Sequence, residues 1–198
     1  MMQKILIIFA HPASHKSKIN RRLIEGLKTM DGITICDLYE KYPDFFINVK
    51  HEQRQLIEND IIIWHHPLYW YSCPALLKEW LDLVLEHGFA YGRNGTKLHG
   101  KKIFNVVTTG GDSSAYNHPG KNQYSIKQLL APFHQTALLC GMQYLPPFVV
   151  HGAHKYDSVK VRLDITKYQQ IITGLRDNVF NEESIASCNY LNELITGE

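Results

Sequence analysis

Residues 5–9 read Ile5-Leu6-Ile7-Ile8-Phe9, a continuous apolar run that stops at His11-Pro12. A strand that is apolar at every position, rather than at alternate ones, is typical of a central parallel strand covered on both faces. After it come Ser14 and Ser17, which can cap a helix, and then apolar residues at helical spacing up to Met30. This part of the chain therefore predicts a strand, a loop and a helix.

The same order of elements recurs along the rest of the chain. Apolar and β-branched segments predict further strands at 33–36, 61–64, 103–107 and 148–150. Helical periodicity predicts helices at 49–59, 74–88, 125–139 and 158–176. Strands that alternate with helices at this spacing imply right-handed crossovers and a parallel sheet. We therefore expect an α/β fold with a five-stranded parallel sheet and helices on both faces.

The composition indicates an ordinary soluble domain. The 198 residues include 21 Lys+Arg and 19 Asp+Glu, so the formal net charge is +2. Without a dense cluster of basic residues, nucleic acid is not an expected partner. The four cysteines lie far apart without a C-x-x-C pair, which argues against disulfides and zinc. The apolar run near the N-terminus is too short for a secretory signal, so we expect a cytoplasmic protein.

The chemistry is expected where the strands end. In an open α/β sheet, ligands bind outside the carboxyl ends of the strands, so the loops after the first, third and fourth predicted strands should converge. The first loop, from His11 to Asn20, carries hydroxyl and amide groups and enters a helix whose free N–H groups favour a phosphate. Neither a P-loop motif nor G-x-G-x-x-G is present, so neither a nucleoside triphosphatase nor a Rossmann site is indicated.

The other two loops supply an aromatic surface and a flexible backbone. The second loop reads Pro67-Leu68-Tyr69-Trp70-Tyr71-Ser72-Cys73-Pro74. Its aromatic side chains either cover a planar ring or fill core space. The third loop, Thr108 to Gly111, ends in two glycines that let backbone N–H groups approach a ligand closely. Together the three loops describe a monophosphate site, an aromatic shelf and a polar backbone edge, and this combination fits flavin mononucleotide (FMN).

Several motifs in this order resemble the NAD(P)H:quinone oxidoreductase family of flavodoxin-like flavoproteins. The segments that carry the resemblance are Ile8 to Pro12 with Ser17 and Asn20, Pro67 to Trp80, Gly88 to Gly92, and Thr108 to Gly111. Two further segments, Tyr42-Pro43-Asp44-Phe45 and Leu145-Pro146-Pro147-Phe148, resemble the bacterial branch that includes the ancillary subunit of the glutathione-gated potassium-efflux system.

The resemblance implies an FMN-binding flavodoxin-like domain, which we place over residues 1–178, and the polar residues 179–198 are expected to form a C-terminal tail. We expect that tail to be loosely packed, with a short helix within 182–195. The family forms homodimers, takes hydride from NAD(P)H and passes two electrons to a quinone by a ping-pong mechanism. The FMN contacts that carry over are His11, Ser17, Lys18, Ile19, Asn20, Leu68, Tyr69, Trp70, Tyr71, Thr108, Thr109, Gly110 and Gly111.

The catalytic positions carry over less completely. In mammalian-type relatives, a tyrosine and a histidine downstream of the T-T-G-G turn assist hydride transfer. Tyr116 stands at the matching distance from Thr108, whereas no histidine does, and His118 is the nearest candidate. Either side chain could donate a proton to the quinone oxygen as it is reduced. His118-Pro119-Gly120 also fits an ordinary loop turn.

Other functions stay open beside the quinone reductase. The branch resemblance supports a regulatory ancillary subunit of a potassium-efflux transporter, which would lie peripherally on the cytoplasmic face of the inner membrane. An azo or nitroaromatic reductase could use the same scaffold. A one-electron flavodoxin carrier fits less well, because such carriers are strongly acidic and shorter. A metal site is not expected, because His65 and His66 are adjacent and would point to opposite faces of a strand.

Overall fold

A parallel sheet forms the centre of the molecule in a computed structural model that describes residues 2–154 and 158–195. The sheet order is β2-β1-β3-β4-β5, and β6 pairs with β4 as well. The strands of the described residues are β1 (Ile5–Phe9), β2 (Ile33–Asp37), β3 (Ile61–Pro67), β4 (Lys102–Thr108), β5 (Gln143–Tyr144) and β6 (Phe148–Val150). All of the pairings between these strands are parallel.

The fifth position of the sheet is occupied by two short strands. β5 pairs with the start of β4, at Lys102 and Ile103, while β6 pairs with its end, at Val106 to Thr108. Between them stand Pro146 and Pro147, which lack the backbone N–H that a continuous ladder needs. The predicted five-stranded parallel sheet is therefore confirmed, with a fifth strand in two pieces, of which the sequence predicted only the second.

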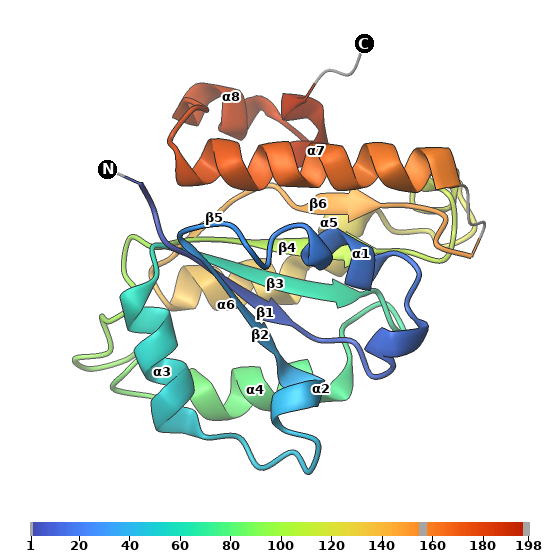
Figure 1. The fold of residues 1–198 in the computed structure, drawn as a ribbon. Coiled ribbons are helices and arrows are strands. Elements are labelled where there is room, and N and C mark those ends of the chain that lie inside the picture. The colour runs from blue at the N-terminus through green and yellow to red at the C-terminus, as the bar shows by residue number, and fades with distance from the viewer. Residues whose placement is uncertain (1, 155–157, 196–198) are drawn as a thin grey trace.

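Helices cover both faces of the sheet, as Figure 1 shows. One face packs against α1 (Asn20–Glu25) and α7 (Ser158–Arg176), and the other packs against α3 (Val49–Glu58), α4 (Ala75–Val84), α5 (Ile126–Leu129) and α6 (Ala131–Leu139). In β1, Leu6 and Ile8 face one cluster, whereas Ile5, Ile7 and Phe9 face the other. This two-sided burial explains why the strand is apolar at every position.

Three predicted helices differ from the structure. The helix expected at 74–88 is shorter, because α4 spans only Ala75–Val84 and both Pro74 and Leu85 have non-helical backbone angles. The first helix was expected to reach Met30, but α1 ends at Glu25, and Gly26 follows it where a Cβ atom would collide with the Gln169 side chain of α7. The helix expected at 125–139 is divided at Leu130 into α5 and α6. Pro132 lies in the first turn of α6, where its missing N–H costs no helical hydrogen bond. A short helix that the sequence did not predict, α2 (Leu38–Lys41), follows β2 directly.

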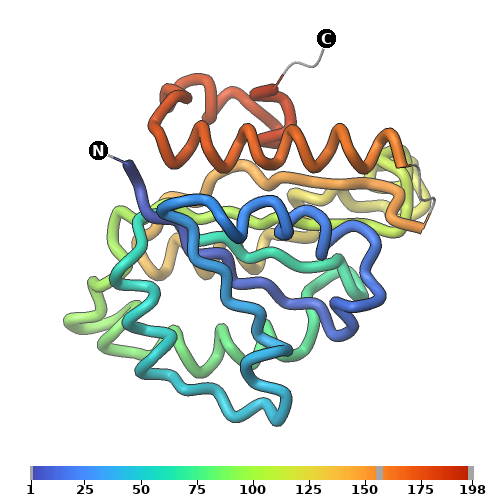
Figure 2. The backbone as a smooth tube through the Cα atoms, in the orientation of Figure 1, coloured from blue at the N-terminus to red at the C-terminus, as the bar shows by residue number. Residues whose placement is uncertain are grey.

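The C-terminal segment is better packed than predicted. It contains α8 (Glu182–Ser187) and a 3-10 turn, η3 (Leu191–Leu194), and it folds back along α7 (Figure 2). Ile185 and Leu191 are buried. The side chain of Asn192 pairs with the backbone of Val149 in β6, accepting from its N–H and donating to its carbonyl, both at 2.9 Å. A domain boundary at residue 178 stays a prediction, and residues 196–198 of the expected tail lie outside the described residues.

Within residues 2–154 and 158–195, no helix is long and apolar enough to cross a membrane.

Candidate functional site

The carboxyl ends of the parallel strands meet at one end of the molecule, toward which the arrowheads of β3 and β6 point in Figure 1. A cavity of about 470 Å³ opens there. Residues from the loops after β1, β3, β4 and β6 line it: His11, Ala13, Lys16, Ser17, Lys18, Ile19, Asn20, Pro67, Leu68, Tyr69, Thr108, Gly110, Ala153 and His154. The structure thus brings the three predicted loops together, and we call this space the phosphate-side cavity.

A second cavity of about 320 Å³ adjoins it and shares Leu68, Gly110 and His154 with it. This aromatic-side cavity is lined by Leu68, Trp70, Tyr71, Gly110, Gly111, Ala115, Tyr116, Lys121, Asn122 and His154. Of the two predicted catalytic residues, Tyr116 lines it, whereas His118 is exposed and lines neither cavity as described. Thr109 is buried beneath the turn between the cavities.

Asn20 joins the first loop to the third. Its backbone N–H, at the first residue of α1, donates to Ser17 Oγ at 3.1 Å. Its side-chain Nδ2 donates to Thr108 Oγ1 at 2.9 Å. Its Oδ1 is buried and has no hydrogen-bond partner among the described residues. An unpaired buried acceptor is costly, so an oxygen in this position is suited to a donor supplied by a ligand.

The aromatic loop is a tight turn that holds Trp70 away from the core. Tyr69 and Ser72 exchange backbone hydrogen bonds of 3.2 and 2.9 Å, and Trp70 and Tyr71 between them have φ angles of 48° and 62°. Positive φ at both central residues is strained for bulky side chains. Trp70 is 94% exposed and Tyr71 51%. The interpretation that these two rings fill core space is therefore wrong, and the backbone presents them to the cavity rim.

The turn after β4 is held by a hydroxyl and an imidazole. Thr109 Oγ1 donates to the carbonyl of Gly111 at 2.9 Å, and it lies 3.0 Å from His151 Nδ1. Because the hydroxyl proton is used on Gly111, the hydrogen bond with His151 requires a proton on Nδ1. Burial lowers the pKa of His151, which favours a neutral ring with that proton on Nδ1. The turn also lies against the His154 ring, with which a Cβ atom at Gly110 would collide unless that ring moved.

Two histidines near the site, His151 and His154, were not predicted from the sequence. The ring of His151 lies 5.7 Å from the ring of Tyr116, centroid to centroid, and His154 lines both cavities. Both follow β6 in the segment His151-Gly152-Ala153-His154. The rule that places ligands at the carboxyl ends of strands applies to this strand as well. Only the loops after the first, third and fourth predicted strands were expected to form the site. The loop after the fifth predicted strand, which carries these histidines, was not included.

His11 contributes to the site as a neutral ring. It is buried, and its Nδ1 accepts a hydrogen bond from the N–H of Ala13 at 3.1 Å. Burial lowers the pKa of His11. Its ring also meets the edge of the Tyr69 ring at 6.1 Å. His11 therefore shapes the wall between the first and second loops rather than supplying a charge.

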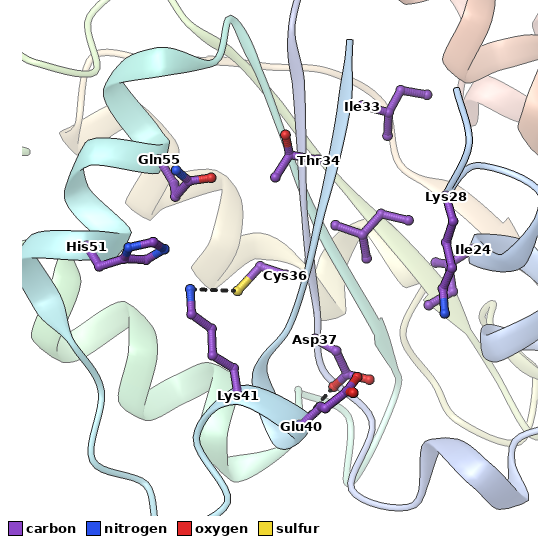
Figure 3. Close-up of a pocket in the computed structure, with 11 residues that line it drawn as sticks. Ile24, Lys28, Ile33, Thr34, Cys36, Asp37, Glu40, Lys41, His51 and Gln55 are labelled. Carbon is purple, nitrogen blue, oxygen red and sulfur yellow. Dashed lines mark hydrogen bonds between the residues drawn. The ribbon is translucent and has the colours of Figure 1, made fainter. Parts of the chain in front are cut away.

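Another hollow, of about 620 Å³, runs along the edge strand β2 (Figure 3). Lys41 lies within it and points toward Cys36, with 3.8 Å between Nζ and Sγ. Burial and the nearby Glu52 carboxylate raise the pKa of the Cys36 thiol to about 12, so it is not a nucleophile at neutral pH. The lining mixes acidic with basic side chains, and no site was predicted there.

Glu52 is buried behind this hollow with three strong donors. Lys41 Nζ and Tyr42 Oη each donate to it at 2.7 Å, and Trp80 Nε1 donates at 3.0 Å. Burial by itself would raise the pKa of the carboxyl, but these donors outweigh it and hold the pKa below its ordinary value. Glu52 is thus a structural anion that fixes α2 and α4 around α3. Across the part of the chain that the structure describes, no group of three or more His, Cys, Asp or Glu residues could hold a metal ion.

A family model described as the flavodoxin-like fold matches residues 3–172. The chain belongs to this flavodoxin-like family. The resemblance inferred from the sequence is therefore confirmed.

Two relatives of this flavodoxin-like protein carry the name of an ancillary protein. The glutathione-regulated potassium-efflux system ancillary protein KefG of Serratia proteamaculans is 46% identical over 165 residues, which covers 83% of this chain and 90% of the relative. The protein of the same name from Salmonella paratyphi C is 47% identical over 153 residues, covering 77% and 84%. The branch that the sequence resembles is thus the branch of these relatives.

A solved structure shows the same architecture with a ligand. The general stress protein 14 of Treponema denticola, in complex with FMN, has a TM-score of 0.81 and is 34% identical to this flavodoxin-like chain, covering 89% of it and 99% of the solved chain.

Proposed function

We propose that this chain is the FMN-binding ancillary subunit of a glutathione-gated potassium-efflux transporter, and that it also reduces quinones with NAD(P)H. The alignment with a relative that carries this ancillary name covers 90% of that relative at 46% identity. They favour the ancillary role over an independent quinone reductase, which the sequence put first. The redox activity is supported by the site itself and by a neighbour solved with FMN.

The observation that carries FMN binding is the unpaired Oδ1 of Asn20 in the wall of the phosphate-side cavity. A ribityl hydroxyl would supply the donor that this oxygen lacks among the described residues. Lys16 and Lys18 line the same cavity and would offset the charge of a phosphate group. Gly110 and Gly111 would bring backbone N–H groups close to the ring system. The residues therefore fit the cofactor that the sequence predicts.

When bound, FMN supplies the capacity to accept hydride from a nicotinamide and to pass two electrons to an acceptor. The residues of the chain orient and shield the reacting groups. Trp70 and Tyr71 would cover the planar ligands and exclude water from them. Thr109 and His151 hold the glycine turn in place. The Tyr116 hydroxyl would donate a hydrogen bond, and then a proton, to the acceptor oxygen.

A homodimer completes this proposal. The Trp70 side chain is 94% exposed at the open side of the aromatic-side cavity. A large aromatic surface of this kind is typical of an interaction site. We place the second copy over this rim, so that the two chains enclose the acceptor between them.

Reconstitution tests the redox proposal. Purified protein is titrated with FMN, and the flavin absorbance is followed while NADH or NADPH is added, and then a quinone. We expect bleaching by a nicotinamide and recovery with the quinone. A holoprotein that oxidises neither nicotinamide would contradict the reductase activity. If the flavin absorbance recovers faster with an azo or nitroaromatic compound than with any quinone, that compound and not a quinone is the preferred acceptor.

A flux measurement tests the ancillary role. Potassium efflux is measured from cells that carry the transporter, with and without this chain, after addition of a glutathione adduct. We expect faster efflux with the chain. The variant Asn20→Asp, which is expected to bind FMN weakly, serves as the comparison that separates the ancillary role from the redox reaction. Unchanged flux together with failure to co-purify with the transporter would overturn the ancillary proposal.

A further inference from the structure

A buried chain of hydrogen bonds runs through the sheet to the base of the aromatic turn. Tyr144 Oη donates to Asn105 Oδ1 at 2.6 Å. Asn105 Nδ2 lies 3.0 Å from His66 Nε2, and His66 Nδ1 lies 3.0 Å from the carbonyl oxygen of Pro67. The side chains of His66 and Asn105 are fully buried. The chain therefore links β5, β4 and β3 to the point where the second loop leaves the sheet.

The Pro67 carbonyl, which can only accept, fixes the direction of every hydrogen bond in the chain once the imidazole carries a single proton. Asn105 accepts the hydrogen bond from the Tyr144 hydroxyl with its side-chain oxygen. Its amide nitrogen therefore faces His66 and can only donate. His66 Nε2 must therefore accept. Burial lowers the pKa of His66 to about 4, so the ring is neutral at physiological pH and its single proton lies on Nδ1. That proton is donated to Pro67. Phe133 stacks on the imidazole at 5.3 Å and 26°, which hinders rotation of the ring.

The peptide group between Pro67 and Leu68 is thereby held at both of its polar ends. His66 donates to its carbonyl oxygen, and its N–H, which belongs to Leu68, donates to the Thr108 carbonyl at 2.8 Å. Because a peptide group is planar, two such bonds fix its orientation. This orientation sets the direction in which the chain enters the turn that carries Trp70. Pro67 and Leu68 also line the phosphate-side cavity.

We propose that His66 is a positioning residue for the flavin site: through the Pro67–Leu68 peptide it sets where the aromatic turn lies over the cofactor. This inference rests on the proposed FMN binding. His66 does not line either cavity in the described structure, so its effect is transmitted by the peptide group. Asn105 and Tyr144 act on the same peptide group by holding the imidazole in the required tautomer.

Two substitutions separate the two nitrogens of His66. In His66→Asn, the amide nitrogen can take the place of Nδ1 and still donate to Pro67. In His66→Gln, the longer side chain places its amide near Nε2, so the contact with Asn105 can survive while the bond to Pro67 is lost. Each variant is examined without flavin by hydrogen exchange at the Leu68 amide and with flavin by the dissociation constant of FMN.

We expect His66→Gln to exchange the Leu68 amide roughly tenfold faster and to bind FMN roughly tenfold more weakly, because one net hydrogen bond is lost. For His66→Asn, we expect the Leu68 exchange rate and the dissociation constant of FMN to stay within about threefold of the wild-type values, a smaller change than in His66→Gln. A purely structural role predicts the opposite order, since asparagine leaves the larger cavity and should lower the melting temperature more. Equal effects of the two variants, or effects that follow the melting temperature, would overturn the proposal.

A second variant keeps the test decisive if neither histidine variant folds. Tyr144→Phe removes the hydroxyl that orients Asn105, and we expect a severalfold acceleration of exchange at Leu68. Tyr168→Phe is the matched control, because its hydroxyl also contacts a buried histidine, His65, at 3.4 Å, on the other face of the sheet. Unaltered exchange at Leu68 in Tyr144→Phe would refute the positioning role. If the wild type binds no FMN while Leu68 exchange still responds as described, the proposed function fails and the positioning of the turn stands.

Discussion

Asn20 Nδ2 donates to Thr108 Oγ1 across 2.9 Å and joins the first turn of α1 to the last residue of β4. The substitution Asn20→Asp replaces this donor with an oxygen and adds a negative charge to the phosphate-side cavity. We expect the dissociation constant of FMN to rise by about tenfold or more, from the lost hydrogen bond and the charge repulsion. Quenching of flavin fluorescence measures it. Asn189→Asp, at an exposed position near the C-terminus, is the control and should bind as the wild type does.

Trp70 offers a test of the aromatic surface that leaves the core untouched. Because the ring is 94% exposed in the single chain, Trp70→Ala should change the free energy of unfolding of the monomer by less than about 0.5 kcal/mol, as for other surface substitutions, whereas it should weaken the proposed dimer. We expect the KM for a quinone to rise about three- to tenfold, which corresponds to the loss of one aromatic contact. Steady-state kinetics together with urea unfolding checks both statements. An unchanged KM would show that the acceptor does not contact this ring.

The buried Glu52 and the exposed Asp82 provide matched ion pairs. Glu52 pairs with Lys41 at 2.7 Å and is itself fully buried, whereas Lys78 and Asp82 are both more than half exposed. We expect Glu52→Gln to lower the free energy of unfolding by roughly 2–4 kcal/mol, because Lys41 loses its counter-charge in a partly buried position. Asp82→Asn should cost less than about 0.5 kcal/mol. Similar losses in the two variants, measured by urea unfolding, would contradict the structural role given to Glu52.

His65 makes stability depend on pH in the acid range. Burial lowers its pKa from 6.5 to about 3, with the adjacent His66 adding to the effect. Between these values the unfolded chain binds a proton that the folded chain does not, so stability falls as the pH is lowered from 6.5 and is independent of this group above 6.5.

Unfolding in that pH range takes up a proton at His65. We therefore expect His65→Phe to lower the number of protons taken up on unfolding by about one, which reduces the slope of the unfolding free energy against pH. The substitution removes the unpaired buried Nε2 of His65 and keeps the edge contacts with Phe9 and Tyr168, but it also leaves the buried Tyr168 hydroxyl without its 3.4 Å contact to Nδ1, so we expect a cost of about 1–3 kcal/mol at pH 7. Unfolding curves at several pH values measure the slope. An unaltered slope would mean that His65 does not titrate as its burial requires.

The sheet could be predicted because its strands are buried on both faces. The runs at 5–9 and 61–64 are apolar throughout and appear as the fully buried β1 and β3. β5 could not be predicted in the same way, because it spans only two residues, Gln143 and Tyr144, and is defined by its pairing with β4 rather than by its own composition.

The convergence of the first three loops on one candidate site could be predicted from the sequence, whereas the binding roles of their residues stay predictions. The carboxyl-end rule placed His11 to Asn20, Leu68 to Tyr71 and Thr108 to Gly111 together, and the structure does so. The exposure of Trp70 could not be inferred from the sequence, because an aromatic residue in a loop can be buried in the core or exposed at the rim of a cavity. The φ angles of the turn decide which way the side chain points. The role of His66 could not be predicted, because it depends on a tautomer set by contacts between distant residues. Asn105 is 39 residues from His66, and Tyr144 is 39 residues from Asn105.

The amide of Asn192 occupies the outer side of β6 as a single residue of an additional strand would, using both polar groups of Val149. A bare strand at the border of a sheet is a template on which another polypeptide can assemble. The C-terminal segment therefore protects the protein from self-association on this side, and shortening the chain before Asn192 would turn a closed border into a nucleus for aggregates.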